Sequence, residues 1–427
     1  MRLKRGLIIG TCLELFAIVL ANWQALGGIR TDEAKYLLNI PYPHPPLMRW
    51  IFSMTESLAP VGSGFQEMLW RLLLATLLVQ AVWLVWDMTS PDRSGGASKG
   101  HMEDRMMVCA GWLLSAAVLT QAGTIAMAPI MAVQALALLW LRTRPVIVGR
   151  FPAWIGLGWL ATVFTSYTGV LLFPLAWDAL RRAKISRGET AVYVFGPVAL
   201  LALYTLTNPL IPAIMLVHGN EGTGTGFATQ TLGFARLWLI GGSAVASAVG
   251  TWGIVTGRDR PLLFSALLVS AYVFFSITPW YYAILFAPLF VGGLRNVFHE
   301  RRHPHAFPLL SCLLFSSAII VWFWQPQRAA GPARETMQAI AALQDSDEPV
   351  PPFEALNGSR AEAGTVLIAG SFGHEWQYES RGAIRRYRLE LVKDATAIVC
   401  LNACDPMFDT SGWRRVPGVP AETWVRK

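Results

Sequence analysis

The stretch RTDEAKYLLNIPYPHPPLMRW (30–50) gathers acidic, imidazole and guanidinium groups in a chain that is otherwise poor in charge. Asp32 and Glu33 are adjacent carboxylates, His44 stands among prolines, and Arg49 follows them. A carboxylate or an imidazole can take the proton of an attacking hydroxyl group, and a guanidinium can stabilise an anionic leaving group. The stretch therefore suits group transfer from an anionic carrier to a hydroxyl acceptor.

The residues after Thr31 predict a short amphipathic helix, with Thr31 as its N-cap and Pro41 at its end. Helical spacing places Asp32 on a polar face with Tyr36, whereas Glu33 borders an apolar face. A helix at a membrane surface would then present Asp32 to a water-filled site. The alternative is that the acids only complement the helix dipole.

The segment PYPHPPL (41–47) is predicted to be rigid and extended, because each proline fixes its own φ and restricts the residue before it. It would hold His44 at a set distance from Asp32. The next helix begins near Leu47 and brings Arg49 to the same loop.

The composition indicates a polytopic membrane protein. The chain has 427 residues, of which 54% are hydrophobic and 15% charged, against about 25% charged in a typical soluble domain. The formal net charge of +8 does not indicate nucleic-acid binding, because the basic residues occupy short loops between apolar runs.

About eleven apolar segments are predicted as transmembrane helices, several of them shorter than the roughly 20 residues that a full crossing needs, so the count stays open between ten and thirteen. They lie near 7–27, 65–87, 106–120, 124–141, 153–167, 168–180, 190–208, 235–255, 261–277, 280–294 and 306–324. We therefore expect a transmembrane domain over 1–325, with its first outer loop at 28–64, and a small domain over 326–427.

Loops that are rich in lysine and arginine alternate along the chain with loops that are poor in them, and this pattern predicts a cytoplasmic N-terminus. The first outer loop, the Gly-rich loop near 218–233 and everything after about 325 would then lie outside, in the periplasm of a bacterial-type inner membrane. The first apolar run resembles a signal peptide, but it continues to Leu26 without an A-x-A site, so we expect it to stay as an anchor.

The C-terminal region predicts a small α/β domain. TVLIAG (365–370) and ATAIVCL (395–401) are predicted as buried strands, with a helix within 373–390 between them. The pair Cys400 and Cys404 is as compatible with a disulfide as with free thiols. His374 and Glu375 are predicted to be surface residues.

Three charged residues within apolar segments also need partners. Glu14 lies in the middle of the first span, where it has a functional role or pairs with a neighbouring helix. Glu67 and Arg71 stand four residues apart and are predicted to pair.

The first outer loop, with DEA-x-Y (32–36) followed by HPPL (44–47), resembles that of the GT-C glycosyltransferases. The most similar group is the protein O-mannosyltransferase and aminoarabinose-transferase type. RLLLATLLVQAVWLV (71–85) and TPWYYAILFAPLF (278–290) are similar to two membrane helices of that group, so the resemblance covers roughly 1–325.

The resemblance implies inverting transfer of a hexose or pentose from a polyprenyl-phosphate carrier to a hydroxyl of a cell-envelope glycan, lipid or protein. It makes Asp32 the general base. Glu33, Tyr36 and His44 would support it, and the donor phosphate or carrier would contact a set of basic and aromatic residues. These are Arg30, Arg49, Arg71, His218, Arg236, Tyr281 and Tyr282.

The sequence departs from that group at three places. Ala128 stands where many relatives have an acidic residue, so we expect no obligate metal and no cofactor beyond the lipid-linked donor substrate. Trp280 replaces an arginine that relatives often have. The C-terminal part has no β-trefoil repeats, which argues against the eukaryotic protein-modifying branch.

Two other functions stay open. A multi-pass transporter or lipid flippase without covalent chemistry would favour repeat symmetry and broken helices, and no internal repeat is evident in the sequence. A membrane scaffold would not need Asp32, His44 or Arg49.

Overall fold

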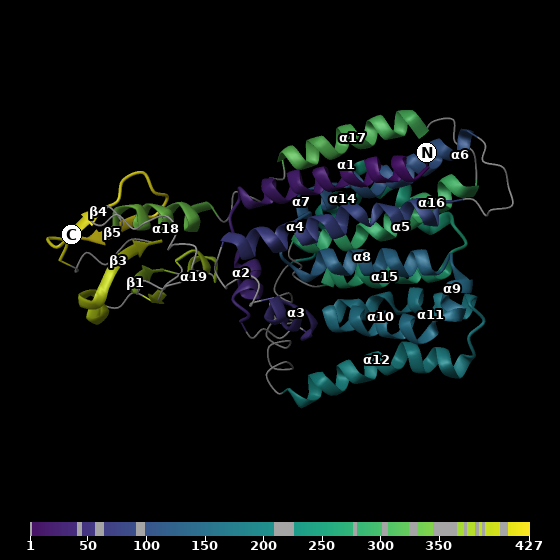
Figure 1. Ribbon diagram of the computed structural model, residues 1–427, viewed down its shortest axis with the longest axis horizontal. Helices are drawn as coiled ribbons and strands as arrows, with labels where there is room; N and C mark the ends of the chain where they lie inside the picture. The colour runs from purple at the N-terminus through teal and green to yellow at the C-terminus, as the bar shows by residue number, and fades with distance from the viewer. Residues whose placement is uncertain are drawn as a thin grey trace. The chain divides into compact units, whose positions relative to one another are not determined.

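The computed structural model describes residues 2–40, 45–55, 64–90, 99–208, 226–275, 280–300, 306–323, 331–344, 365–370, 374–380, 384–386, 389–401 and 409–427 (Figure 1). The chain divides into two compact units. Unit 1 comprises 1–21, 42–50 and 72–325, and unit 2 comprises 22–41, 51–71 and 326–427. Two segments around the first outer loop thus belong to the same unit as the C-terminal region.

Unit 1 is helical, and Figure 1 shows its helices running roughly parallel to one another. The helices that lie wholly or partly in it are α1 (Arg2–Ala25), α3 (Leu47–Thr55), α4 (Gly64–Gln80), α5 (Val82–Met88), α6 (Lys99–Leu113), α7 (Ala116–Gln121), α8 (Met127–Leu141), α9 (Pro145–Arg150), α10 (Pro152–Thr165), α11 (Phe173–Arg182), α12 (Arg187–Thr207), α14 (Phe227–Thr256), α15 (Arg260–Phe275), α16 (Phe286–Glu300) and α17 (Ala306–Phe323). Two 3₁₀ segments, η1 (Tyr167–Leu172) and η2 (Trp280–Leu285), precede α11 and α16.

Each predicted span falls on one of these helices or on consecutive ones. Among the described residues, five helical segments are long and apolar enough to cross a membrane: Gly6–Ala25, Gly64–Met88, Arg187–Thr207, Phe227–Thr256 and Trp280–Phe298. Large apolar side chains such as Leu7, Leu206 and Trp322 are exposed on α1, α12 and α17, as lipid-facing residues are. The chain is a multi-pass membrane protein. One boundary was predicted wrongly, because α14 begins at Phe227, inside the predicted Gly-rich loop.

Helices α14 and α16 approach closely because glycines face each other between them. A Cβ atom added to Gly253 would meet the backbone of Gly293, and one added to Gly293 would meet the backbone of Gly250. Small residues at such contacts let membrane helices pack backbone to backbone, where van der Waals contact replaces the hydrophobic effect.

Helix α14 contains a break at Ser243, whose φ of 62° is left-handed. The Ala116 amide N donates to Ser243 Oγ at 2.9 Å, and Ser243 Oγ lies 2.7 Å from Ser317 Oγ. Ser317 Oγ donates in turn to the Leu114 carbonyl. The hydroxyl groups of Ser243 and Ser317 therefore satisfy the Ala116 amide and the Leu114 carbonyl, which lie at the junction of α6 and α7 beside the break.

Glu14 is paired within unit 1. Thr76 Oγ1 donates to Glu14 Oε1 at 2.6 Å, and Gln80 Nε2 donates to Glu14 Oε2 at 3.2 Å. Of the two predicted alternatives, the structure thus shows the pairing between neighbouring helices.

Unit 2 contains a five-stranded sheet with strand order β2-β1-β3-β5-β4. Its strands are β1 (Thr365–Ala369), β2 (Ile384–Arg386), β3 (Ala395–Cys400), β4 (Trp413–Arg415) and β5 (Glu422–Arg426). β1 pairs in parallel with β2 and β3, and β5 pairs antiparallel with β3 and β4. The two strands predicted from the sequence are confirmed as β1 and β3.

Alternation along the strands gives the sheet two buried faces. Val366, Ile368 and Val399 pack with residues of two helices, α18 (Gly331–Gln344) and α19 (His374–Ser380). Leu367 and Ile398 face the opposite side, beside η6 (Leu389–Asp394). A sheet covered on both faces explains why both strands read as continuous apolar runs.

Part of the C-terminal prediction was wrong. The expected helix within 373–390 is only α19, and the chain then forms the edge strand β2. Pairing with β1 overrides local helix propensity there. Cys400 is disulfide-bonded, and Cys404 lies outside the described residues.

Candidate functional site

The first turn of α2 (Thr31–Leu37) carries both acids of the first outer loop. The helix begins at Thr31 itself, so Arg30, and not Thr31 as predicted, is the cap residue. The Arg30 amide N donates to Glu33 Oε2 at 3.0 Å. The carboxylate of Glu33 thus reaches back to satisfy an amide at the helix start, which replaces the capping expected from Thr31.

The C-terminal end of α2 also differs from the prediction. Asn39 has a left-handed φ of 49°, so the helix ends before Pro41 is reached. Asparagine tolerates this conformation better than other non-glycine residues. Gln66 Nε2 donates to the Leu37 carbonyl at 3.3 Å and satisfies one of the last carbonyls of the helix.

Asp32 and Glu33 have different environments, as the helical spacing predicted. The Asp32 side chain is 37% exposed, and its Oδ1 lies 2.9 Å from Lys35 Nζ. The Glu33 side chain is only 3% exposed. Of the two acids, Asp32 is the one that a substrate in water can reach.

Arg71 holds Glu33 in the interior of unit 2. Its Nη1 donates to Glu33 Oε1 at 2.9 Å, its Nε donates to Glu67 Oε1 at 2.8 Å, and its Nη2 donates to the Gly28 carbonyl at 2.8 Å. The Arg71 side chain is 1% exposed. The predicted pairing of Glu67 with Arg71 is confirmed, and one guanidinium ties α4 to both α2 and the loop before it.

Arg334 on α18 extends this set of ion pairs. Its Nη2 lies 2.6 Å from Glu67 Oε2, its Nε donates to Glu379 Oε1 at 2.9 Å, and its Nη1 donates to the Ala25 carbonyl at 2.8 Å. Glu33, Arg71, Glu67, Arg334 and Glu379 thus form a continuous chain of ion pairs, which we call the unit 2 ion-pair chain. Two acids share each arginine, so each buried carboxylate has a cationic partner.

Glu375, which was predicted to be a surface residue, is partly exposed and has a partner in a distant part of the chain. Thr31 Oγ1 donates to Glu375 Oε2, so α19 contacts the first residue of α2. The partners are 344 residues apart in the sequence. No local spacing or motif could signal such a contact, and the same holds for Arg334 and Glu379.

A pocket of about 300 Å³ borders the ion-pair chain within unit 2. Its charged lining residues are Glu67, Arg334 and Glu379, and Gln338 and Tyr378 add further polar groups. This cavity has the size of a small-molecule site.

Tyr36 packs in an aromatic stack on the same unit. Its ring lies 5.8 Å from that of Phe52 in a stacked arrangement, and Phe52 lies 4.1 Å from Trp70. The stack links α2, α3 and α4 and fixes the helix face that carries Asp32.

Arg30 provides a cation next to the two acids. Burial lowers the pKa of the Arg30 guanidinium, the Glu33 carboxylate raises it, and the charge of Arg71 lowers it further. Arg30 and Arg71 thus both lie within electrostatic reach of Glu33, where burial reduces solvent screening.

The remaining predicted residues lie on unit 1. Arg49 is half-buried on α3, and Arg236 is exposed on α14. In η2, Tyr282 is buried and its ring lies 5.1 Å from that of Tyr281. His44 and His218 lie outside the described residues.

Within the described ranges, the side chains of His, Cys, Asp and Glu form no group of three or more that could hold a metal ion. The carboxylates of the unit 2 ion-pair chain are instead engaged with arginines.

No protein-family profile matches the chain. No curated protein sequence matches it either.

Solved structures do match the fold. ArnT from Cupriavidus metallidurans bound to undecaprenyl phosphate aligns with a TM-score of 0.60 at 13% identity, covering 99% of this chain and 98% of ArnT. The apo state of the same protein aligns with a TM-score of 0.58 at 14% identity, covering 100% and 98% of the two chains. An Archaeoglobus fulgidus oligosaccharyltransferase aligns at 11% identity over 91% of this chain and 67% of its own, but its TM-score of 0.41 is too low to support an argument. The chain therefore has a fold similar to that of ArnT.

Proposed function

We propose that this protein transfers a sugar from a polyprenyl-phosphate carrier to a hydroxyl group of a cell-envelope glycan, lipid or protein. Its fold resembles that of ArnT, whose structure holds undecaprenyl phosphate, and this supports the choice of donor. The sugar is a hexose or a pentose, and the reaction inverts the anomeric centre.

The observation that carries the proposal is the contrast between the two acids of α2. Glu33 is buried and bonded to Arg71, whereas the neighbouring Asp32 is partly exposed beside Lys35. A general base has to reach solvent or substrate and must also be held in place. Asp32 meets the first condition, and the bonds of Glu33 meet the second.

In the proposed step, the acceptor oxygen attacks the anomeric carbon while the bond from that carbon to the phosphate oxygen breaks. Asp32 takes the acceptor proton, and the lipid phosphate leaves with its bonding electrons. Cations and hydrogen-bond donors stabilise the charge that develops on the phosphate. Arg30, Arg49, Arg236, His44 and His218 are the candidates for this role, and Tyr281 and Tyr282 are candidates for contact with carrier or sugar.

Arg71 takes a different role in this proposal from the one that the sequence suggested. Its guanidinium donates to two carboxylates and a carbonyl and is fully buried. We assign it as a positioning residue, which acts on Asp32 through Glu33 and α2. A direct contact with the donor phosphate would require these bonds to break.

The proposed location is a bacterial-type inner membrane, with the N-terminus in the cytoplasm and α2 and the C-terminal sheet in the periplasm. The alternation of basic loops supports this orientation. It places the active site on the side where cell-envelope acceptors are found.

The test is a search for a covalent product. Purified protein in vesicles receives a polyprenyl-phosphate donor with a radiolabelled sugar, together with an envelope extract as acceptor. We expect label to move from the lipid into acceptor. Movement of labelled donor across the vesicle membrane without any covalent product would instead establish the transporter or flippase function.

A further inference from the structure

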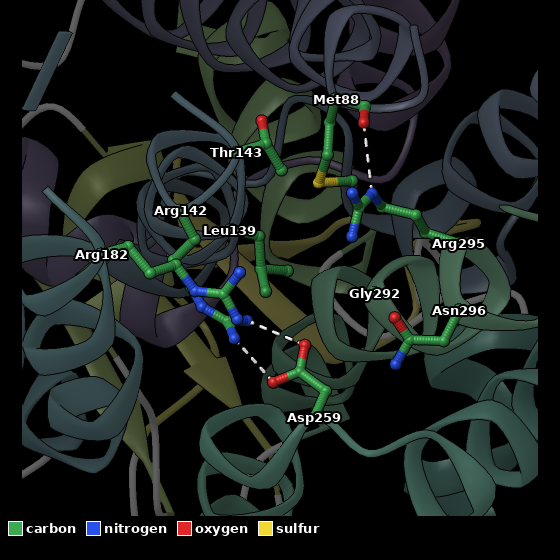
Figure 2. A pocket seen from close by; sticks show the side chains of 9 residues that line it. All are labelled: Met88, Leu139, Arg142, Thr143, Arg182, Asp259, Gly292, Arg295 and Asn296. Carbon is green, nitrogen blue, oxygen red and sulfur yellow. Dashed lines mark hydrogen bonds and ion pairs between the residues drawn. The ribbon is translucent and has the colours of Figure 1, made fainter. Parts of the chain in front are cut away.

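A second polar pocket lies in unit 1, at an end where several helices meet (Figure 2). Met88 ends α5, Arg142 follows α8, Arg182 ends α11, Asp259 precedes α15, and Arg295 lies in the last turns of α16. The pocket has a volume of about 70 Å³. This is room for more than one water molecule, and hence for a small tetrahedral anion.

Two of its arginines are neutralised by carboxylates. Arg142 Nε donates to Asp178 Oδ2 at 2.6 Å, and Arg142 Nη1 and Nη2 donate to Asp259 at 3.1 and 2.6 Å. Arg182 Nε shares Asp178 Oδ2 at 2.6 Å. The two arginines and two aspartates therefore balance.

Arg295 is the third arginine of the pocket, and its positive charge is additional to the four charges that balance. Its Nε donates to the Met88 carbonyl at 3.2 Å, and among the described residues no carboxylate lies within 4.0 Å of its nitrogens. Figure 2 shows Arg142 and Arg182 extending into the view from one side and Arg295 from the other. The remaining charged neighbours, Arg144 and Asp87, pair with each other at 2.8 Å and add no net charge.

We propose that this pocket binds the phosphate of an anionic phospholipid headgroup. A partly buried guanidinium without a carboxylate is stabilised by an anion, and the planar fork of arginine matches phosphate oxygens. The pocket lies at the ends of apolar helices, where lipid headgroups are the most concentrated source of phosphate. Basic pockets between membrane helices bind anionic lipid headgroups in other proteins.

The positive-inside pattern predicts that this end of the helices is cytoplasmic. The site is therefore separate from the proposed donor site, which is predicted to be periplasmic. Its occupancy does not depend on whether the glycosyltransferase proposal is correct.

A purely structural role is the competing explanation, because arginines at helix ends also satisfy terminal carbonyls. Arg295 does this for Met88. That role predicts a loss of stability when Arg295 is changed, but it predicts no selectivity among lipids. Lipid selectivity is thus the readout that separates the two explanations.

The experiment is native mass spectrometry of the full chain in detergent, titrated with phosphatidylglycerol or phosphatidylcholine. We compare the wild type with Arg295→Gln and with the control Arg150→Gln, which removes the same charge from an exposed position on α9. We expect Arg295→Gln to weaken phosphatidylglycerol binding about tenfold, as loss of a charge-assisted contact would. Phosphatidylcholine binding and the Arg150→Gln variant should be unchanged.

Unchanged phosphatidylglycerol binding in Arg295→Gln would overturn the proposal, and so would an equal loss in Arg150→Gln. If Arg295→Gln fails to fold, Arg182→Gln makes the same comparison, because its side chain is 51% exposed and its loss should disturb the fold less. A competition arm adds inorganic phosphate. Displacement of bound phosphatidylglycerol by phosphate would support recognition of its phosphate group, whereas binding of phosphate without any binding of phosphatidylglycerol would overturn the assignment to a lipid headgroup.

Discussion

At the scale of single residues, the proposed function rests on two adjacent acids with opposite environments. Asp32 has a partly exposed carboxylate beside Lys35, and the buried carboxylate of Glu33 is paired with Arg71. Neighbouring positions on a helix point about 100° apart. One acid can therefore be held by the protein interior while the other faces substrate.

The burial of Glu33 against Arg71 leads to a prediction about the stability of the protein. Arg71→Met should lower the free energy of unfolding by about 3–5 kcal/mol, because it leaves Glu33 and Glu67 buried without their cation. Chemical or thermal unfolding of the purified protein would measure the loss. Arg414→Met, an exposed position in the same unit, is the matched control and should change little.

A second variant separates charge from packing at the same place. Adding Glu33→Gln to Arg71→Met removes one of the stranded carboxylates, so part of the lost stability should return. A double variant no more stable than Arg71→Met would contradict the assignment of Arg71 as the partner of Glu33.

At the scale of elements, close packing of α14 against α16 depends on glycines that have no room for a side chain. Gly293→Ala should destabilise the protein by about 1–3 kcal/mol, because its Cβ would overlap the backbone of Gly250. The control is Gly158→Ala on α10, where an added Cβ meets nothing within 4 Å. Equal melting temperatures for Gly293→Ala and the wild type would rule out this packing.

The sequence predicts elements well where the signal is local. Apolar runs located helices of unit 1 and the strands β1 and β3, and helical spacing separated Asp32 from Glu33. Local rules were less successful at the ends of α2. Arg30 is the N-cap residue where Thr31 was expected, and the left-handed Asn39 follows the end of the helix before Pro41 is reached.

Contacts between distant segments could not be predicted. The tertiary fold brings three charged residues to the segments around the first outer loop: Arg334, Glu375 and Glu379. In the sequence, nothing distinguishes any of them from an ordinary surface charge. Ion pairs form wherever opposite charges meet, so residue type alone does not identify the partners. These residues are the part of the site that only the structure provides.

At the scale of the whole molecule, the chain combines a membrane fold like that of ArnT with a unit whose ion pairs hold α2. We predict that catalysis by this arrangement needs no bound metal. Sugar transfer should survive treatment of the purified protein with a chelator. Loss of transfer that Mg²⁺ or Mn²⁺ restores would contradict the prediction.

The most direct measurement of the central proposal is sugar transfer by Asp32→Asn, with Asp409→Asn as a control that removes an exposed carboxylate of the same unit. Asparagine keeps the shape of the side chain but cannot take the acceptor proton, so we predict a loss of at least about 100-fold in the rate of transfer. Membrane insertion and melting temperature should match the wild type, and Asp409→Asn should keep its activity. Transfer at the wild-type rate by correctly inserted Asp32→Asn would contradict the assignment of Asp32 as the base.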